Sequence, residues 1–337
     1  MTDEIAVVGA GRMGEGIALA FLAAGLPVVL ADVKDRTARE HRAHAERVRA
    51  HLAEQLSVKL GDDAALAGLT VCGREPAGLA GAAVVFEAVP EVLETKRDVL
   101  GWVCSQVGAS TVIASTTSTF LVTEIAELVD RPGRAVNAHW LNPADLMPLV
   151  EVSRSEDTDP DAVSRLTGLL ERVGKIPVVC GPSAGYIVPR LQALVMNEAA
   201  RMVEEGVAGP ADIDLAVRAG LGPRFSVLGP LEFIDWGGGD ILYYASRYLA
   251  ARLGERFRHP DIIEENMAGH RRGLRDGAGF YHYDPGGVAE YRAARMREFE
   301  AIFRLRGPQL RGGTGVPVRP ETGDDRADHR GGRGQRG

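Results

Sequence analysis

The sequence is poor in cysteine and has no excess of basic charge or long apolar run. Only three cysteines occur among 337 residues, and they lack the number and spacing of a disulfide framework or of a metal site. Lysine and arginine number 39 against 46 aspartates and glutamates, so a large basic surface for nucleic acid is not expected. No apolar run approaches the ~20 residues that cross a bilayer.

The N-terminus shows no export signal. An apolar segment, Ile5–Val8, begins almost at once, without a basic region before it or a cleavage site after it. We therefore expect a cytoplasmic protein with neither a membrane nor a nucleic-acid partner. The composition, 45% hydrophobic and 25% charged, is that of an ordinary globular protein. The length predicts about two domains of ~150 residues each.

In the first half, short β-branched runs alternate with helical patterns. The predicted strands cover residues 4–8, 27–32, 69–72, 83–88, 111–115, 134–139, 149–153 and 176–180. The predicted helices cover residues 12–24, 35–59, 92–106, 121–129 and 159–173. This alternation indicates βαβ units and a mainly parallel sheet.

The pattern becomes helical after Gly181-Pro182-Ser183. Helices are predicted over 185–206, from Pro210 onward, over 228–253 with a break at three glycines, and over 288–304. From Gly307 the chain has almost no apolar residues, which predicts disorder. Three parts are therefore expected: an α/β domain over 1–182, an all-α domain over 183–306 and a disordered tail over 307–337.

The first predicted strand leads into Gly9-Ala10-Gly11-Arg12-Met13-Gly14, which has the pattern G-x-G-x-x-G. In a dinucleotide-binding unit, Gly9 makes the tight turn, Gly11 admits the pyrophosphate and Gly14 lets the helix pack on the strand. The phosphates bind free N–H groups at the helix N-terminus, which Arg12 and Met13 begin. The alternative is a glycine-rich turn without a ligand, but the strand–turn–helix context favours a dinucleotide site.

The second predicted strand ends at Asp32. A carboxylate at this place accepts hydrogen bonds from the adenosine ribose and repels a 2′-phosphate. NAD is therefore the expected cofactor, bound by a Rossmann-type, doubly wound domain. Lys34 and Arg36 follow Asp32 and are expected to face solvent.

His139 ends a predicted strand, where ligands bind in open α/β sheets. It opens the segment His139-Trp140-Leu141-Asn142-Pro143, and Glu151 is the one acid in the apolar segment that follows. An imidazole accepts a hydroxyl proton, and a carboxylate fixes its tautomer. The two residues are therefore a candidate base and its orienting partner, whereas the alternative is a histidine that only packs.

These segments resemble the L-3-hydroxyacyl-CoA dehydrogenase family from about residue 4 to residue 283. The matching segments are the glycine-rich turn, Glu87-Ala88-Val89-Pro90-Glu91, Ser115-Thr116-Thr117-Ser118, His139-Trp140-Leu141-Asn142-Pro143, Leu149-Val150-Glu151-Val152, Gly185-Tyr186-Ile187-Val188, Asp212-Ile213-Asp214, Gly229-Pro230-Leu231-Glu232 and Gly277-Ala278-Gly279-Phe280-Tyr281. The resemblance implies an NAD-binding domain followed by a helical domain that forms the homodimer.

The resemblance also implies residue roles. His139 would be the general base, oriented by Glu151, while NAD+ takes the hydride from C3 of the substrate. Ser118 would bind the substrate hydroxyl beside the nicotinamide, and Asn142 would help to place both. Oxidation requires the neutral imidazole, so it is expected to be favoured as the pH rises.

Further cofactor contacts follow from the same resemblance. Glu91 and Lys96 would contact the nicotinamide riboside half of NAD. Two positions depart from the family: Pro189 replaces an asparagine that touches the substrate, and Thr116 replaces the asparagine of an S-N-T-S segment. Proline is compatible with the first turn of a helix, where its missing N–H has no partner.

Arg224 bears on the choice of substrate. It lies in Gly220-Leu221-Gly222-Pro223-Arg224-Phe225, a pattern similar to that of L-gulonate 3-dehydrogenase and lambda-crystallin. An arginine at the substrate mouth can bind a free carboxylate through a bidentate pair. The alternative is an arginine that caps a helix C-terminus.

The sequence thus predicts NAD-dependent oxidation of a short-chain L-3-hydroxyacyl-CoA, similar to 3-hydroxybutyryl-CoA, to the 3-ketoacyl-CoA. One alternative is a dehydrogenase of a free 3-hydroxy carboxylate such as L-gulonate. Another is a non-catalytic, crystallin-like or NAD-sensing protein. No metal site is expected, because His41, His44 and His51 lack ligand spacing with carboxylates.

Overall fold

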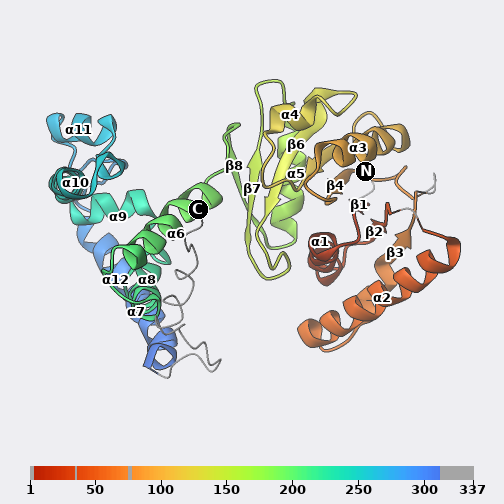
Figure 1. The fold of residues 1–337 in the computed structure, drawn as a ribbon, viewed down its shortest axis with the longest axis horizontal. Helices are drawn as coiled ribbons and strands as arrows, with labels where there is room; N and C mark the ends of the chain where they lie inside the picture. The colour runs from red at the N-terminus through yellow and green to blue at the C-terminus, as the bar shows by residue number, and fades with distance from the viewer. Residues whose placement is uncertain (1–3, 35, 75–77, 312–337) are drawn as a thin grey trace, which may run out of the picture. The chain divides into compact units, whose positions relative to one another are not determined.

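The computed structural model describes residues 4–34, 36–74 and 78–311 (Figure 1). The chain divides into two compact units, Met1–Val195 and Met196–Gly337, and the division falls inside helix α6, Val188–Glu204. Within the described ranges, no helix is long and apolar enough to cross a membrane. The same residues contain no group of three or more His, Cys, Asp or Glu side chains that could hold a metal ion.

The first unit is built on one eight-stranded sheet with the order β3-β2-β1-β4-β5-β6-β7-β8. Its strands are β1 Ile5–Val8, β2 Val28–Ala31, β3 Leu69–Cys72, β4 Val84–Glu87, β5 Val112–Ser115, β6 Ala135–Trp140, β7 Leu149–Ser153 and β8 Ile176–Cys180. All neighbours are parallel except β6 and β7, which are antiparallel. The predicted Rossmann-type doubly wound sheet is thereby confirmed.

Helices cover both faces of this sheet, as expected for a parallel sheet whose strands are buried on two sides. Three of them contribute to the core on one face: α1 (Arg12–Ala23), α2 (Ala38–Leu60) and α5 (Pro160–Arg172). The core on the other face is formed with α3 (Leu93–Gln106) and α4 (Val122–Ala126). Figure 1 shows α1 and α2 on the opposite side of the sheet from α3 and α4.

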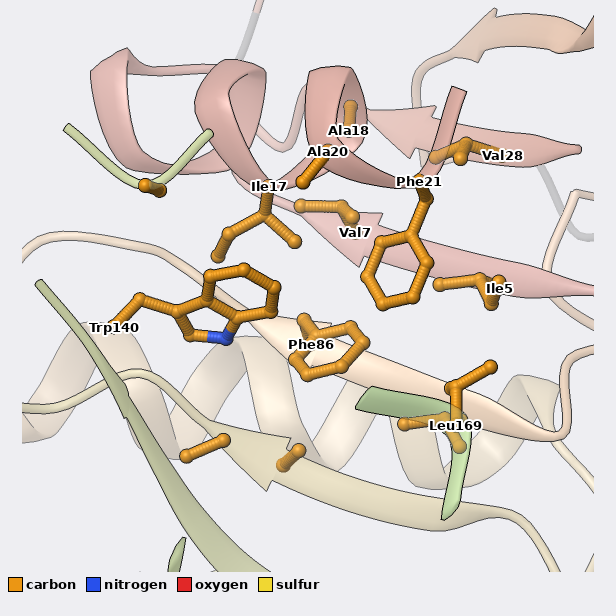
Figure 2. Packing of buried hydrophobic residues seen from close by; sticks show 14 of the residues in the cluster. Ile5, Val7, Ile17, Ala18, Ala20, Phe21, Val28, Phe86, Trp140 and Leu169 are labelled. Carbon is orange, nitrogen blue, oxygen red and sulfur yellow. The ribbon is translucent and has the colours of Figure 1, made fainter. Parts of the chain in front are cut away.

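Three aromatic rings form the centre of the first core (Figure 2). Phe21 of α1 lies 5.4 Å from Phe86 of β4 and 6.1 Å from Trp140 of β6, measured between ring centroids. Phe86 and Trp140 are 5.7 Å apart and nearly perpendicular, a favourable arrangement for aromatic pairs. Successive side chains of a strand point to opposite faces, so the anchoring of Trp140 in this core directs His139 to the other face.

The named elements after β8 are all helical, which confirms the predicted α-helical C-terminal part. They include α7 Pro210–Ala216, the π-helix Val217–Leu221, α8 Gly222–Phe225, α9 Pro230–Gly237, α10 Gly239–Leu253, α11 Asp261–Ala268 and α12 Val288–Arg311. The sequence pattern left residues 254–287 unassigned, so it did not predict α11. Helix α12 continues beyond residue 304 to Arg311, and residues 312–337 of the predicted tail lie outside the described residues.

A buried carboxylate organises the segment Gly277-Ala278-Gly279-Phe280-Tyr281 of the second unit. Asp235, 2% exposed, accepts hydrogen bonds from the backbone N–H groups of Phe280 and Tyr281 and from the hydroxyl of Tyr283. A Cβ atom at Gly279 would lie 2.1 Å from an Asp235 carboxylate oxygen. This motif therefore has a structural role within its own unit.

Two glycines of the turn after β1 are expected to respond differently to alanine. A Cβ atom at Gly14 would lie 1.9 Å from the carbonyl oxygen of Gly9, whereas a Cβ atom at Gly11 would have no neighbour within 4 Å. Gly14→Ala should therefore lower Tm by several degrees, although alanine is favoured in helices by about 1 kcal/mol. Gly11→Ala should leave Tm within about one degree of wild type in a thermal melt. Equal losses of Tm in the two variants would show that the Gly9 carbonyl does not limit the space at Gly14.

Candidate active site

The glycine-rich turn has the geometry that a dinucleotide requires. Gly9 adopts a φ of +115°, donates its N–H to the Ala31 carbonyl and approaches the Ala88 carbonyl too closely for a side chain. Gly11 caps α1, and the open space beside it leaves room for a ligand at the helix N-terminus. Exposed Arg12 and half-buried Met13 begin the helix. The turn therefore fits a bound pyrophosphate.

Asp32 follows β2 and lines a cavity of about 440 Å³. Its side chain accepts a hydrogen bond of 2.6 Å from Nε of Arg36 and a longer one from the Lys34 backbone N–H. Arg36 was expected to face solvent, but its guanidinium instead forms an ion pair with Asp32. His44 lies 3.5 Å from the same carboxylate, and burial lowers its pKa despite the negative charge of Asp32. The cavity is thus rich in polar groups able to bind ribose hydroxyls.

A buried ion network lies at the segment Glu87-Ala88-Val89-Pro90-Glu91. Lys96 has no exposed surface, and its ammonium group donates to both carboxylate oxygens of Glu87 and contacts Glu91 at 3.1 Å. Glu87, at the end of β4, also accepts hydrogen bonds from Ser115 and from the Val89 N–H. Paired and hydrogen-bonded in this way, the buried charges are compensated.

Glu91 links this network to the segment after β5. Its Oε1 accepts hydrogen bonds from the hydroxyl of Thr117 and from the backbone N–H groups of Ser118 and Thr119. Burial opposes ionisation of Glu91, but these hydrogen bonds and the charge on Lys96 lower its pKa overall. Ser118 itself is exposed, so its hydroxyl is accessible beside a rigidly held backbone.

The antiparallel pairing of β6 with β7 brings His139 and Glu151 together. The two residues are directly opposite each other in the register, so their side chains leave the same face of the sheet. Nδ1 of His139 lies 2.8 Å from Oε2 of Glu151, and the two residues are 7% and 0% exposed. A buried carboxylate in this position holds the imidazole with Nδ1 as donor and Nε2 as the remaining nitrogen.

The second oxygen of Glu151 binds the start of α6. Oε1 accepts hydrogen bonds from the backbone N–H groups of Ile187, at 2.9 Å, and Val188, at 2.8 Å. These two N–H groups belong to the start of the helix, where backbone donors lack intrahelical partners, and the side chain of Glu151 supplies the acceptor. Pro189 is the second residue of this helix, where a missing N–H leaves no intrahelical hydrogen bond unmade.

Tyr186 completes the surroundings of His139, and the sequence patterns assign it no role. Its ring stacks on the imidazole with a centroid distance of 4.8 Å and an interplanar angle of 10°. Its hydroxyl donates to the Thr117 carbonyl and accepts from the Asn137 amide. Tyr186 stands in a matched family segment, but only the three-dimensional contacts reveal what its hydroxyl reaches.

Asn142 lies on the connection between β6 and β7, three residues after His139 in the chain. It is exposed and lines a cavity of about 410 Å³ together with Arg12 and His51. Lys175 stabilises the same connection, because its ammonium group donates to the carbonyls of Ala144 and Met147. Lys175 is a further residue that sequence reasoning missed, because nothing local predicts contacts across 28 and 31 residues.

Arg224 belongs to the second unit. Its exposed guanidinium lies over the ring of Phe233 at 5.6 Å, an arrangement that favours a cation. In the part of the chain that the structure describes, its side chain forms no hydrogen bond or ion pair, so no side-chain capping of a helix is seen. The guanidinium is accessible to an anion.

Comparisons with known proteins cover nearly all of the described chain. Residues 4–183 match the model of the 3-hydroxyacyl-CoA dehydrogenase NAD-binding domain, and residues 185–283 match that of the C-terminal domain of the same family. The chain is 33% identical over 311 residues to 5-formyl-3-hydroxy-2-methylpyridine 4-carboxylate 5-dehydrogenase of Mesorhizobium japonicum, covering 90% of this chain and 98% of the relative.

Solved structures show the same similarity. A 3-hydroxyacyl-CoA dehydrogenase from Archaeoglobus fulgidus has a TM-score of 0.75 and 35% identity, over 90% of this chain and 99% of that one. The (S)-3-hydroxybutyryl-CoA dehydrogenase of Ralstonia eutropha has a TM-score of 0.60 and 29% identity, over 84% of this chain and 100% of that one. The predicted family and the predicted NAD cofactor are thereby confirmed.

Proposed function

The chain belongs to the 3-hydroxyacyl-CoA dehydrogenase family of NAD-dependent oxidoreductases, and from this premise we propose that it oxidises a short-chain L-3-hydroxyacyl-CoA to the 3-ketoacyl-CoA. The observation that carries the proposal is the buried, cross-strand pair of His139 and Glu151, whose facing atoms lie 2.8 Å apart. Such a pair is suited to removing a proton from a substrate hydroxyl.

NAD+, when bound, supplies the acceptor for the hydride that leaves C3. Residues of this chain accept the hydroxyl proton and stabilise the charge that results. With Nδ1 of His139 donating to Glu151, Nε2 is the nitrogen that accepts the hydroxyl proton, and the carboxylate stabilises the imidazolium that forms. Ser118 is proposed to hydrogen-bond the substrate hydroxyl, and Asn142 to help place the substrate and the nicotinamide.

Binding of NAD is proposed to use the two ends of the nucleotide site. Gly9, Gly11 and Gly14 with Arg12 and Met13 would hold the pyrophosphate at the N-terminus of α1. Asp32 would accept hydrogen bonds from the adenosine ribose, within its cavity of about 440 Å³. Glu91 would lie at the nicotinamide riboside. Lys96 is expected from the sequence to contact the riboside as well, but it has no exposed surface, so it would act there through Glu91.

A free hydroxy carboxylate is the second candidate substrate. The accessible guanidinium of Arg224 favours it, since such a group can form a bidentate pair with a carboxylate. The name of the Mesorhizobium relative, which gives a pyridine carboxylate, points the same way. A solved structure of a pyridine-carboxylate 5-dehydrogenase, with a TM-score of 0.66 and 32% identity, also bears a free-carboxylate name. The thioester remains the first candidate because the models of both domains and the Archaeoglobus and Ralstonia structures carry the 3-hydroxyacyl-CoA or 3-hydroxybutyryl-CoA name.

A non-catalytic role is less well supported. The departure that favoured it, Pro189, stands in the first turn of α6, where proline costs no hydrogen bond. The His139–Glu151 pair is intact and buried. A buried carboxylate that is hydrogen-bonded to an imidazole at a strand end is an arrangement typical of functional sites.

We also propose that the protein is a homodimer through its helices. Large apolar side chains are exposed on α6 and α10, and association would remove them from water. Those on α6 are Leu191, Leu194, Val195, Met196 and Val203, and those on α10 are Ile241, Tyr244, Tyr248 and Leu253.

His139→Ala is expected to lower kcat by roughly 10²–10⁴, the range for losing a general base. NADH affinity should change little, because the cofactor contacts proposed above lie elsewhere. Steady-state assays with NAD+ and 3-hydroxybutyryl-CoA measure the effect, and His282→Ala, at an exposed histidine of the second unit, is the matched control. A kcat for His139→Ala within about threefold of wild type would remove this residue from the mechanism.

The wild type is expected to have a higher kcat/KM with NAD+ than with NADP+, because the charge of Asp32 repels a 2′-phosphate. Asp32→Ala should narrow that difference, both by removing the charge and by freeing its ion-pair partner Arg36. Arg36→Met serves as the comparison, since it leaves the repulsion in place. Equal use of the two cofactors by the wild type would refute the assignment of Asp32.

Arg224→Met is expected to separate the two substrate classes. If Arg224 binds a substrate carboxylate, the variant should raise KM for a free hydroxy acid 10- to 150-fold, corresponding to about 1.5–3 kcal/mol for a charge-assisted pair. KM for 3-hydroxybutyryl-CoA should barely change. Arg218→Met, at another exposed arginine of the second unit, is the control. A fall in Tm with equal effects on both substrates would indicate a structural role.

A further inference from the structure

Tyr186 connects the proposed base to the loop that carries Ser118. Its ring covers the imidazole of His139 in a nearly parallel stack, 4.8 Å between centroids. The residue is 5% exposed, so the stack is shielded from solvent. Tyr186 precedes α6 in the chain, whereas His139 lies in β6, and the contact is therefore tertiary.

The hydroxyl of Tyr186 is committed to two partners. It donates to the Thr117 carbonyl at 2.7 Å and accepts from Nδ2 of Asn137 at 3.0 Å. Burial raises the pKa of Tyr186, so the phenol keeps its proton and remains a donor at working pH. A hydroxyl engaged in this way positions its neighbours and takes no part in the proton transfer.

The hydrogen bond to Thr117 fixes one particular peptide group. The Thr117 carbonyl belongs to the peptide that joins Thr117 to Ser118, and the N–H of the same peptide donates to Oε1 of Glu91 at 3.0 Å. Since a peptide group is planar, restraints on its oxygen and its nitrogen fix its plane. The backbone of Ser118 is therefore held from both sides.

The backbone at Tyr186 is held in a conformation that non-glycine residues rarely adopt. Its φ is +45°, and the next two N–H groups, of Ile187 and Val188, both donate to Glu151. A bulky residue at positive φ is strained, and such strain persists where surrounding contacts over-determine it. Here those contacts come from the carboxylate that orients His139.

We propose that Tyr186 is a positioning residue that sets the separation between the base His139 and Ser118. Its ring stacks on His139, and its hydroxyl holds the peptide group that joins Thr117 to Ser118. The two backbone N–H groups that follow it donate to the carboxylate of Glu151. This inference rests on the proposed function, because it takes His139 as the base.

Tyr186→Phe tests the hydroxyl while keeping the ring. The variant should lower kcat about tenfold with little change in KM for NAD+, since small displacements of reacting groups reduce rates strongly. Tyr283→Phe is the matched control, because it removes another hydrogen-bonded tyrosine hydroxyl, that of half-buried Tyr283, which donates to Asp235 in the second unit. Tyr283→Phe should lower Tm about as much as Tyr186→Phe does, but it should leave kcat within about twofold of wild type.

Tyr186→Leu tests the ring in the cofactor-free protein. In histidine-labelled protein, the ring protons of His139 should show the upfield shift that a stacked aromatic ring causes. Tyr186→Phe should keep this shift and Tyr186→Leu should lose it. An unshifted His139 signal in the wild type would show that the stack does not form and would overturn the inference, even if a variant folded poorly.

The double variant His139→Ala/Tyr186→Phe separates this inference from the proposed function. If Tyr186 acts by setting the distance between His139 and Ser118, that distance no longer matters once the base is removed, so adding Tyr186→Phe to His139→Ala should change kcat less than twofold. A tenfold further loss, or a single Tyr186→Phe variant with kcat within twofold of wild type, would overturn the positioning role. A fully active His139→Ala variant would instead overturn the proposed function itself.

Discussion

The antiparallel register of β6 and β7 is the constraint on which the candidate active site depends. It places Glu151 directly opposite His139 and, one residue along, Val150 opposite Trp140. Trp140, Val150 and Val152 all lie in the core on the far face, so their burial holds the register. If β7 slipped by one residue, Glu151 would point into the apolar core, and Val150 and Val152 would point toward the imidazole. Such a slip would lower stability, because apolar packing would be lost and a carboxylate would be buried without partners.

Two carboxylates are fully buried in the first unit, and they are compensated in different ways, Glu151 by backbone donors and Glu87 by a lysine. Glu151 has no exposed surface, but its carboxylate accepts hydrogen bonds from two backbone N–H groups and from the imidazole of His139. Glu87 and Lys96, also fully buried, satisfy each other. Removing one member of a buried pair typically costs about 3–5 kcal/mol because the other is left uncompensated. These residues therefore couple the stability of the first unit to the integrity of its site.

The sequence predicted most of this fold because its strands are short, apolar and rich in β-branched residues. The predicted segments at Leu69–Cys72, Leu149–Ser153 and Ile176–Cys180 coincide with β3, β7 and β8. The roles expected for Gly9 and Gly14 in the turn agree with the close approaches seen there. The contacts of Tyr186 could not be predicted, because they depend on where separate segments meet. The ion pair of Arg36 with Asp32 joins residues only four apart, but both lie outside any named helix or strand, where sequence spacing does not fix the geometry. Helix α11 was missed because it is short: its eight residues are too few for a helical period to be recognised in the sequence.

The division of the chain into two units bears on how one reaction could serve different substrates. The proposed base, its carboxylate, the tyrosine beside it and the nucleotide turn all lie within Met1–Val195. Arg224, the residue proposed to distinguish a carboxylate from a thioester, lies in Met196–Gly337. The residues proposed for proton and hydride chemistry therefore pack in one unit, and the residue proposed for anion recognition packs in the other. A change at Arg224 is therefore expected to leave the β6–β7 register undisturbed. The proteins similar to this chain carry both acyl-CoA and pyridine-carboxylate names.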